Sequence, residues 1–366
     1  MRIDKGYISG RQFMFSVACF IQSSALLTAF LAAVTLQDSW LAVLSGIVVC
    51  LPLTWLFRSL MIMFPQRNLL QILEEVYGAV AGKIIGCAYI WFFFTLGSLN
   101  LIDLSEFTKL TIMEKTPATV LSIMCILVCA LAVRNGIKLV TRFSALFVTV
   151  AFIILAVSVL LIFNQINLGN FLPVFDQPIG KYIQGTHIIT TIPFGEMVAF
   201  LMINSNVRMS RRDTTKYLFW GFAMGGITVL AIMLRDIAVL GNTLDMFTLP
   251  SLVTLRMVNL GMALSRMEIL FAVVLIMLLF FKITFLYYVS VLGVAELLKV
   301  RAYRHLVLAM GAFMIAYGLT LYPYPVEHAA SAQEIVPFLW TPFEILIPLL
   351  TFIIGKLRKL PKAREV

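Results

Sequence analysis

Long runs of apolar residues alternate with short polar segments along the whole chain. The hydrocarbon core of a bilayer is about 30 Å thick, and about 20 helical residues cross it. Ten such runs occur in the 366 residues, and we predict a membrane-spanning α-helix in each. They cover residues 13–36, 40–63, 84–107, 118–133, 141–163, 184–204, 217–240, 268–298, 305–322 and 337–355. The expected fold class is therefore an all-α transmembrane bundle, with residues 1–366 forming a single polytopic membrane domain.

The distribution of basic residues between these runs predicts the orientation of the helices. With the N-terminus in the cytoplasm, 21 of the 28 Lys and Arg residues fall in cytoplasmic segments, six fall outside and one, Lys282, lies within a span. An excess of positive charge on the cytoplasmic side is the rule for membrane proteins. Both termini are therefore expected in the cytoplasm. Topology, rather than binding to nucleic acid, explains the net charge of +10.

Composition excludes several classes of protein. Hydrophobic residues make up 61% of the chain and charged residues 13%, whereas soluble domains are about half apolar and about a quarter charged. The five cysteines lie in or beside apolar runs without metal-ligand spacing, so we expect buried thiols and neither a metal nor a cofactor. The sequence also lacks a P-loop and a nucleophile elbow. An enzyme is therefore not expected.

The sixth run contains a helix break beside a carboxylate. Proline removes a backbone donor and clashes with the preceding turn, and a nearby glycine loosens the backbone further. A carboxylate deep in a span is costly unless it has a partner or faces a water-filled cavity. Two interpretations are open: a proline kink with a neutral, hydrogen-bonded glutamate, or a substrate or gating site. The candidate ligand-binding residues here are Thr191, Pro193, Phe194, Gly195 and Glu196.

The first run is interrupted by small and polar residues in the middle of an apolar helix. They either expose backbone groups to a ligand or allow close packing of helices. Five spans on each side of the chain's midpoint give two halves of opposite topology, and transporters with such inverted repeats have a broken helix at the matching position of each half. We therefore predict a 5+5 inverted repeat with discontinuous spans one and six. The candidate ligand-binding residues of span one are Gln22, Ser23, Ser24 and Ala25.

Lys282 lies within the eighth run, too deep to reach the interface easily. Its depth from the outer face is about 21 Å, against about 18 Å for Glu196, at 1.5 Å per residue. We expect the two to face one polar cavity, paired directly or through water; the alternative is an ion pair with a purely structural role. Asn100, Asp103 and Glu106 share one face of the third span. They indicate either a solvated helix end or a ligand contact, and Asn100 is a candidate ligand-binding residue.

Two further patterns concern packing and loops. The glycine pairs Gly82-x-x-x-Gly86 and Gly221-x-x-x-Gly225 are typical of closely packed membrane helices. Residues 241–267 contain a helix-like apolar pattern after a proline, and we predict a helix there on the outer surface.

Several short motifs, in order along essentially the whole chain, resemble those of the endospore germination permeases. These are the B subunits of nutrient germinant receptors, within the amino acid–polyamine–organocation superfamily. The motifs are Ile8-Ser9-x-x-Gln12, Ser23-Ser24-Ala25-Leu26-Leu27, Asn170-Phe171-Leu172-Pro173-Val174, Pro193-Phe194-Gly195-Glu196, Leu249-Pro250-Ser251 and Arg266-x-Glu268. Members of the family often have glycines in the span-one break, where this chain has Ser23, Ser24 and Ala25.

The resemblance implies a LeuT-like core of ten helices, with spans one and six unwound around a ligand site. It implies a nutrient germinant as the ligand, often an amino acid. It also implies assembly with an A-type membrane subunit and a lipoprotein C-type subunit in the spore inner membrane, with both termini on the spore core side.

The expected function is therefore that of a germinant sensor whose ligand binds between spans one, three, six and eight. Backbone amides after the span-six break would meet a carboxylate, and Glu196 would meet an ammonium group. Two alternatives are open. One is a proton-coupled amino acid or amine transporter in which Glu196 carries the proton, and the other is a ligand-gated water or ion pathway.

Overall fold

The structure is a computed structural model, and it describes residues 6–257, 267–300, 302–322 and 324–361. Within these ranges the secondary structure is helical, apart from one isolated parallel bridge between Ile8 and Val207. Eight stretches of the described residues are long and apolar enough to cross a membrane, and the helix at 118–134 is apolar but shorter. The chain is therefore an all-helical protein built for a bilayer, while the count of ten spans stays a prediction.

Seven helices run without interruption over residues predicted as spans. They are α3 (Ser39–Met63), α5 (Ala79–Thr111), α6 (Ala118–Arg134), α8 (Ser144–Ile162), α10 (Arg211–Leu240), α12 (Met267–Leu297) and α13 (Leu306–Leu321). Helix α10 begins earlier than predicted because Ser210 caps it, with its hydroxyl accepting a hydrogen bond from the Asp213 amide at 3.1 Å. Polar residues thus extend the helix beyond its apolar run.

Spans one and six are both broken, as predicted. The first consists of α1 (Gly10–Gln22), η1 (Ser23–Leu26) and α2 (Leu27–Thr35), and the sixth of α9 (Ile179–Ile189), η5 (Thr190–Phe194) and η6 (Gly195–Asn206). Ser24 departs from helical dihedral angles at φ −85° and ψ 18°. Ile192, directly before Pro193, is extended at φ −113° and ψ 115°, as expected for a residue that precedes proline.

The last span has an irregular middle that the sequence analysis did not predict. It runs through α15 (Val336–Thr341), η9 (Pro342–Leu346) and α16 (Ile347–Leu357). The η9 segment is a single π-helical turn that starts at Pro342 and contains the buried Glu344. Although π-helical turns are rare in proteins, those that occur often lie at functional sites. This segment is therefore of interest for the site described below.

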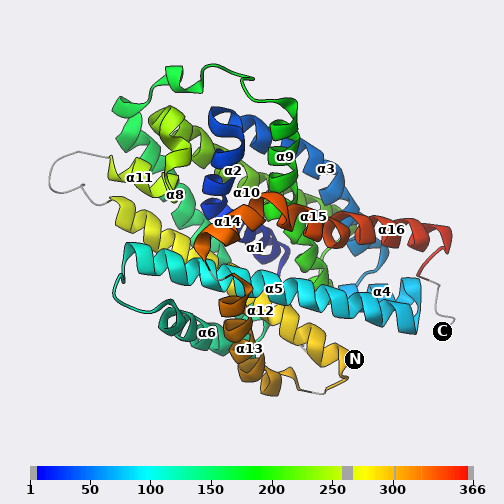
Figure 1. Ribbon diagram of the computed structural model, residues 1–366. Helices are drawn as coiled ribbons and strands as arrows, with labels where there is room; N and C mark the ends of the chain where they lie inside the picture. The colour runs from blue at the N-terminus through cyan, green and yellow to red at the C-terminus, as the bar shows by residue number, and fades with distance from the viewer. Residues whose placement is uncertain (1–5, 258–266, 301, 323, 362–366) are drawn as a thin grey trace.

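Helix α5 crosses the front of the bundle in Figure 1, with α14 (Pro325–Glu334) on one side of it and α6 and α13 on the other. It packs along α12, and α1 packs along α10. Helices α1 and α10 approach each other closely at two glycines. A Cβ on Gly221 would lie 2.6 Å from the Met14 carbonyl oxygen, and a Cβ on Gly225 would lie 2.5 Å from the Ile21 Cβ. The predicted role of this glycine pair in close packing agrees with the contact.

Helices α4 (Leu69–Tyr77) and α11 (Pro250–Arg256) lie at opposite ends of the bundle in Figure 1.

Short segments complete the chain: η2 (Leu36–Asp38), α7 (Ile137–Val140), η3 (Phe163–Gln165), η4 (Leu168–Phe171), η7 (Gly241–Met246) and η8 (Tyr303–His305). The helix predicted after the proline within 241–267 is represented by α11, and residues 258–266 lie outside the described part of the chain.

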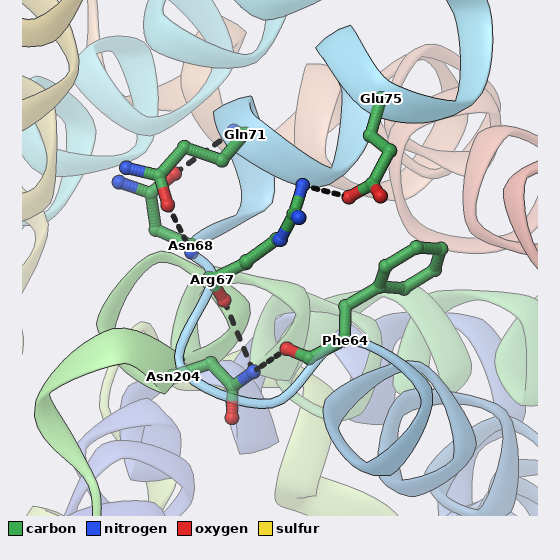
Figure 2. Close-up of polar contacts among 6 residues, drawn as sticks. All are labelled: Phe64, Arg67, Asn68, Gln71, Glu75 and Asn204. Carbon is green, nitrogen blue, oxygen red and sulfur yellow. Dashed lines mark hydrogen bonds and ion pairs between the residues drawn. The ribbon is translucent and has the colours of Figure 1, made fainter. Parts of the chain in front are cut away.

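Polar contacts hold α4 to the rest of the bundle (Figure 2). The Asn204 side chain, at the end of η6, donates hydrogen bonds to the carbonyl oxygens of Phe64 and Arg67, each at 3.0 Å. Arg67 forms an ion pair with Glu75 on α4. We call the turn at residues 64–67 and α4, held in this way, the α4 latch.

Both ends of the described chain lie near the α4 latch. The Ile8 amide donates to the Asn206 carbonyl at 3.0 Å, and Arg358 donates to the Val76 carbonyl at 2.8 Å. The described part of the chain therefore begins and ends at the same end of the bundle.

Candidate functional site

A cavity of about 60 Å³ lies between the two broken helices. The span-one break contributes Ser23 and Ser24, and the span-six break contributes Ile192 and Glu196. Helices α5, α12, α14 and α15 close the remaining walls, as does Phe30 of α2. These walls contain Leu96, Leu99, Asn100, Asp103, Leu279, Lys282, His328, Ala332, Val336 and Trp340.

Lys282 connects the two breaks. Its Nζ lies 2.5 Å from Glu196 Oε2 and donates to Ser24 Oγ at 2.8 Å. The contact with Glu196 is an ion pair by distance, without the angle of a hydrogen bond. Both side chains are 2% exposed, and the ammonium group also lies 4.9 Å from the centre of the Phe20 ring. The structure thus pairs directly the two ionisable residues that the sequence placed at similar depth.

A second pair lies on the wall formed by α5 and α14. His328 Nδ1 is 3.2 Å from Asp103 Oδ1, and the Tyr322 ring stacks on His328 at 4.9 Å between centres. This pair joins α14 to α5 beside the cavity. The sequence analysis grouped Asp103 with Asn100 and Glu106; Asp103 and Asn100 line the cavity, and Glu106 is not among its lining residues.

The sequence analysis missed Glu344 altogether. This residue of η9 is fully buried, and a Cβ on Gly195 would lie 2.3 Å from its Oε2. Its carboxylate therefore faces the backbone of the span-six break, next in sequence to Glu196. A signal existed, because a proline closely followed by a glutamate occurs in both segments, at Pro193 and at Pro342.

The other predicted site residues fall into two groups. Gln22 and Ala25 line a second cavity of about 30 Å³ among α1, α8, α10 and α12. Thr191 donates to the His187 carbonyl at 2.9 Å in its own helix, and Phe194 packs against Phe222. The predicted residues that line neither cavity are Thr191, Pro193, Phe194 and Gly195.

One basic residue predicted in an outer segment lies inside the bundle instead. Arg235, counted among the outer basic residues, is buried in α10. Its guanidinium donates to Asp236 at 2.7 Å and to Ser158 at 3.1 Å, and Asp236 accepts a hydrogen bond from Ser251. A local carboxylate partner permits this burial, which hydropathy alone could not show.

The charges of the cavity suit a small molecule that carries both signs. Glu196 and Asp103 contribute carboxylates, and Lys282 contributes an ammonium group. Among the described residues, no group of three or more His, Cys, Asp or Glu side chains is arranged to hold a metal ion.

Two solved structures share the arrangement of helices. The chain matches MhsT in complex with L-phenylalanine with a TM-score of 0.71 at 12% identity, over 96% of this chain and 89% of that one. It matches MHP1, a nucleobase-cation-symport-1 family transporter, in a closed conformation with bromovinylhydantoin bound, with a TM-score of 0.66 at 14% identity, over 90% and 76% of the two chains. At these identities the likeness shows the fold, which is the LeuT-like fold that the family resemblance implies.

Sequence relatives define the family. The chain is 27% identical to spore germination protein KB of Bacillus subtilis (strain 168) over 99% of this chain and 98% of the relative. It is 23% identical to the putative spore germination protein YfkT of the same strain, over 88% of each chain. The family model described as spore germination protein, or spore permease, matches residues 7–321. The chain therefore belongs to the spore germination protein family.

Proposed function

We propose that this protein is the B subunit of a nutrient germinant receptor in the spore inner membrane and binds a small germinant, an amino acid, in the cavity between the two helix breaks. The observation that carries this proposal is the Lys282–Glu196 pair on the cavity wall. A zwitterion that enters between them offers its carboxylate to Lys282 and its ammonium group to Glu196. Each charge of the ligand thus replaces a charge of the pair.

Other groups of the cavity favour the same ligand. The indole N–H of Trp340 is buried and has no hydrogen-bond partner among the described residues, so it is available to a carboxylate. Asn100 uses its amide nitrogen for the Leu96 carbonyl at 2.8 Å, which leaves its side-chain oxygen as an acceptor for an ammonium group. Specificity in such sites comes from a few well-placed polar groups.

The cavity must expand to admit this ligand. A volume of about 60 Å³ holds a few water molecules, whereas ligand pockets commonly have about 300–1,000 Å³. The wall formed by α14 and α15 contacts α2 and the span-six segments at its edges. We infer that this wall moves on binding, and that the described structure is the closed state. Ligand binding then signals by favouring a different arrangement of the wall.

A thermal-shift screen of the purified full-length protein tests the proposal. The probes are the twenty amino acids, with glucose, fructose and inosine as other nutrient classes. We expect at least one amino acid to raise the melting temperature, and the shift to disappear in Lys282→Met and in Glu196→Gln. A response to sugars or nucleosides alone would contradict the amino acid assignment. A response that both variants retain would contradict the site.

A second candidate function is transport, favoured by the match to MHP1, whose description names a transporter. The two functions are separated by uptake of the radiolabelled amino acid identified in the screen into proteoliposomes. Binding without saturable uptake supports a receptor, and concentrative uptake supports a carrier.

We further propose that the chain assembles with an A-type and a lipoprotein C-type receptor subunit, and that both its termini lie on the spore core side. Support comes from family membership and from the shared location of the two chain ends at the α4 latch. Co-purification of a tagged chain with both subunits from spore membranes tests the assembly.

A further inference from the structure

Glu344 is a buried carboxylate to which the structure gives no partner. It is 0% exposed, and neither of its oxygens has a hydrogen-bond partner among the described residues. A buried ionised carboxylate is paired, binds a cation, or becomes neutral by taking up a proton, because the cost of desolvation is otherwise too large.

Three polar groups near Glu344 have other partners. Cys50 of α3 donates to the Thr190 carbonyl at 3.6 Å, and Tyr89 of α5 donates to the Phe343 carbonyl at 2.6 Å. Lys282 of α12 is occupied by Glu196 and Ser24. The thiol and the phenol therefore have other acceptors, and the Lys282 charge is already paired with Glu196.

The two charged groups that act on Glu344 oppose each other. Glu196 of η6 repels a negative charge at this position, and Lys282 attracts one. Because these two residues form an ion pair with each other at 2.5 Å, their fields largely cancel at a third group. A negative charge on Glu344 thus gains little net stabilisation from the pair.

The surroundings leave no space for a substituent larger than hydrogen on Gly195. A Cβ there would lie 2.3 Å from Glu344 Oε2 and 2.6 Å from its carboxyl carbon. The carboxyl group thus packs directly on the backbone of the span-six break, where any movement of η6 relative to η9 changes its access to water.

We propose that Glu344 is a proton-binding site that is protonated in the closed structure and releases its proton when η6 and η9 separate. Glu196, which the sequence suggested as a proton carrier, has a counter-ion in Lys282, whereas Glu344 has none within the part of the chain that the structure describes. The closed state then binds one more proton than the open state. By linkage, acidic pH favours the closed state, and rising pH favours opening.

This inference does not depend on which ligand occupies the cavity, so its test requires none. Infrared difference spectra of the full-length protein in lipid nanodiscs report the carbonyl stretching band of protonated carboxylic acids. We expect such a band at neutral pH, its loss in Glu344→Gln, and a shift of the band in Glu344→Asp. Glu334→Gln, which removes an exposed carboxylate from neighbouring α14, is the control and should retain the band.

Three results would overturn the proposal. One is the absence of the band from the wild-type protein, and another is its persistence in Glu344→Gln. The third is a band that appears only when choline replaces sodium in the buffer, which would make Glu344 a site for an alkali cation. A failure of the amino acid screen would leave each of these readouts unaffected, so the two proposals fail separately.

Hydrogen exchange measures the coupling to movement. Gln resembles the protonated acid, so Glu344→Gln should slow amide exchange in residues 336–346 relative to the wild type at alkaline pH. The difference should vanish at acidic pH, where the wild type is protonated as well. Equal exchange of the two proteins at every pH would show that the proton does not control the closed state.

Discussion

At the scale of single residues, the Lys282–Glu196 pair is the contact that most strongly determines the site. Breaking a buried ion pair by removing one partner costs about 3–5 kcal/mol, because the other charge stays buried without compensation. We therefore expect Lys282→Met and Glu196→Gln each to lower the free energy of unfolding by about that amount. The double variant should lose less than the sum of the two, and denaturant unfolding in detergent measures all three.

Exposed residues of the same types are the matched controls for this cycle. Lys181→Met and Glu334→Gln change surface positions, where substitutions usually stay within about 0.5 kcal/mol. If the losses of the two single variants at Lys282 and Glu196 simply add, the residues do not interact energetically, and the argument for a shared site fails.

At the scale of elements, Asn204 joins the end of span six to the turn of the α4 latch, which follows α3. Asn204 supplies hydrogen bonds to two carbonyl oxygens there. Leaving buried polar groups unsatisfied costs about 1–3 kcal/mol, so Asn204→Ala should loosen the turn and speed amide exchange in residues 64–77. Asn135→Ala removes an exposed side chain that donates to the Leu131 carbonyl of the adjacent helix α6, and it should leave this exchange unchanged. Protection that survives in Asn204→Ala would show that packing alone holds the latch.

The second element-scale prediction concerns the wall formed by α14. The Asp103–His328 pair joins α14 to α5 beside the cavity. Cysteines at both positions, in a background without the native cysteines, should react with a short bifunctional thiol reagent. The product should no longer respond to the amino acid found in the screen. Each single-cysteine variant, treated in the same way, should still respond, and a cross-linked protein that binds normally would show that ligand enters by another route.

At the scale of the whole molecule, the orientation predicted from charge can be tested by fusions. Alkaline phosphatase folds into its active form outside the cytoplasm, so a fusion after Asp176, between η4 and α9, should be active. A fusion after Ser210, which directly precedes α10, should be inactive, and a fluorescent protein at the same two places should give the opposite pattern. Activity at Ser210 alone would invert the topology and place the α4 latch on the outer face.

The sequence by itself determined that the protein belongs in a membrane, where most of its helices and the two helix breaks lie, and that Glu196 and Lys282 lie at similar depth. The length of a hydrophobic span is set by the bilayer, and a proline weakens its helix because it removes a backbone hydrogen-bond donor, whatever the helix packs against. Depth follows from the rise per residue, so Glu196 and Lys282 could be matched across 86 positions without a structure.

Only the tertiary structure decided which side chains meet. The direction in which a residue points depends on the rotation of its helix against its neighbours, and apolar runs with lipid on one side do not reveal it. That is why Gln22 and Ala25 line a separate cavity, why Asp103 meets His328, and why Glu344 of the last span lies against Gly195. The pairing of distant segments, rather than any local pattern, leaves the Glu344 carboxylate without a partner among the described residues.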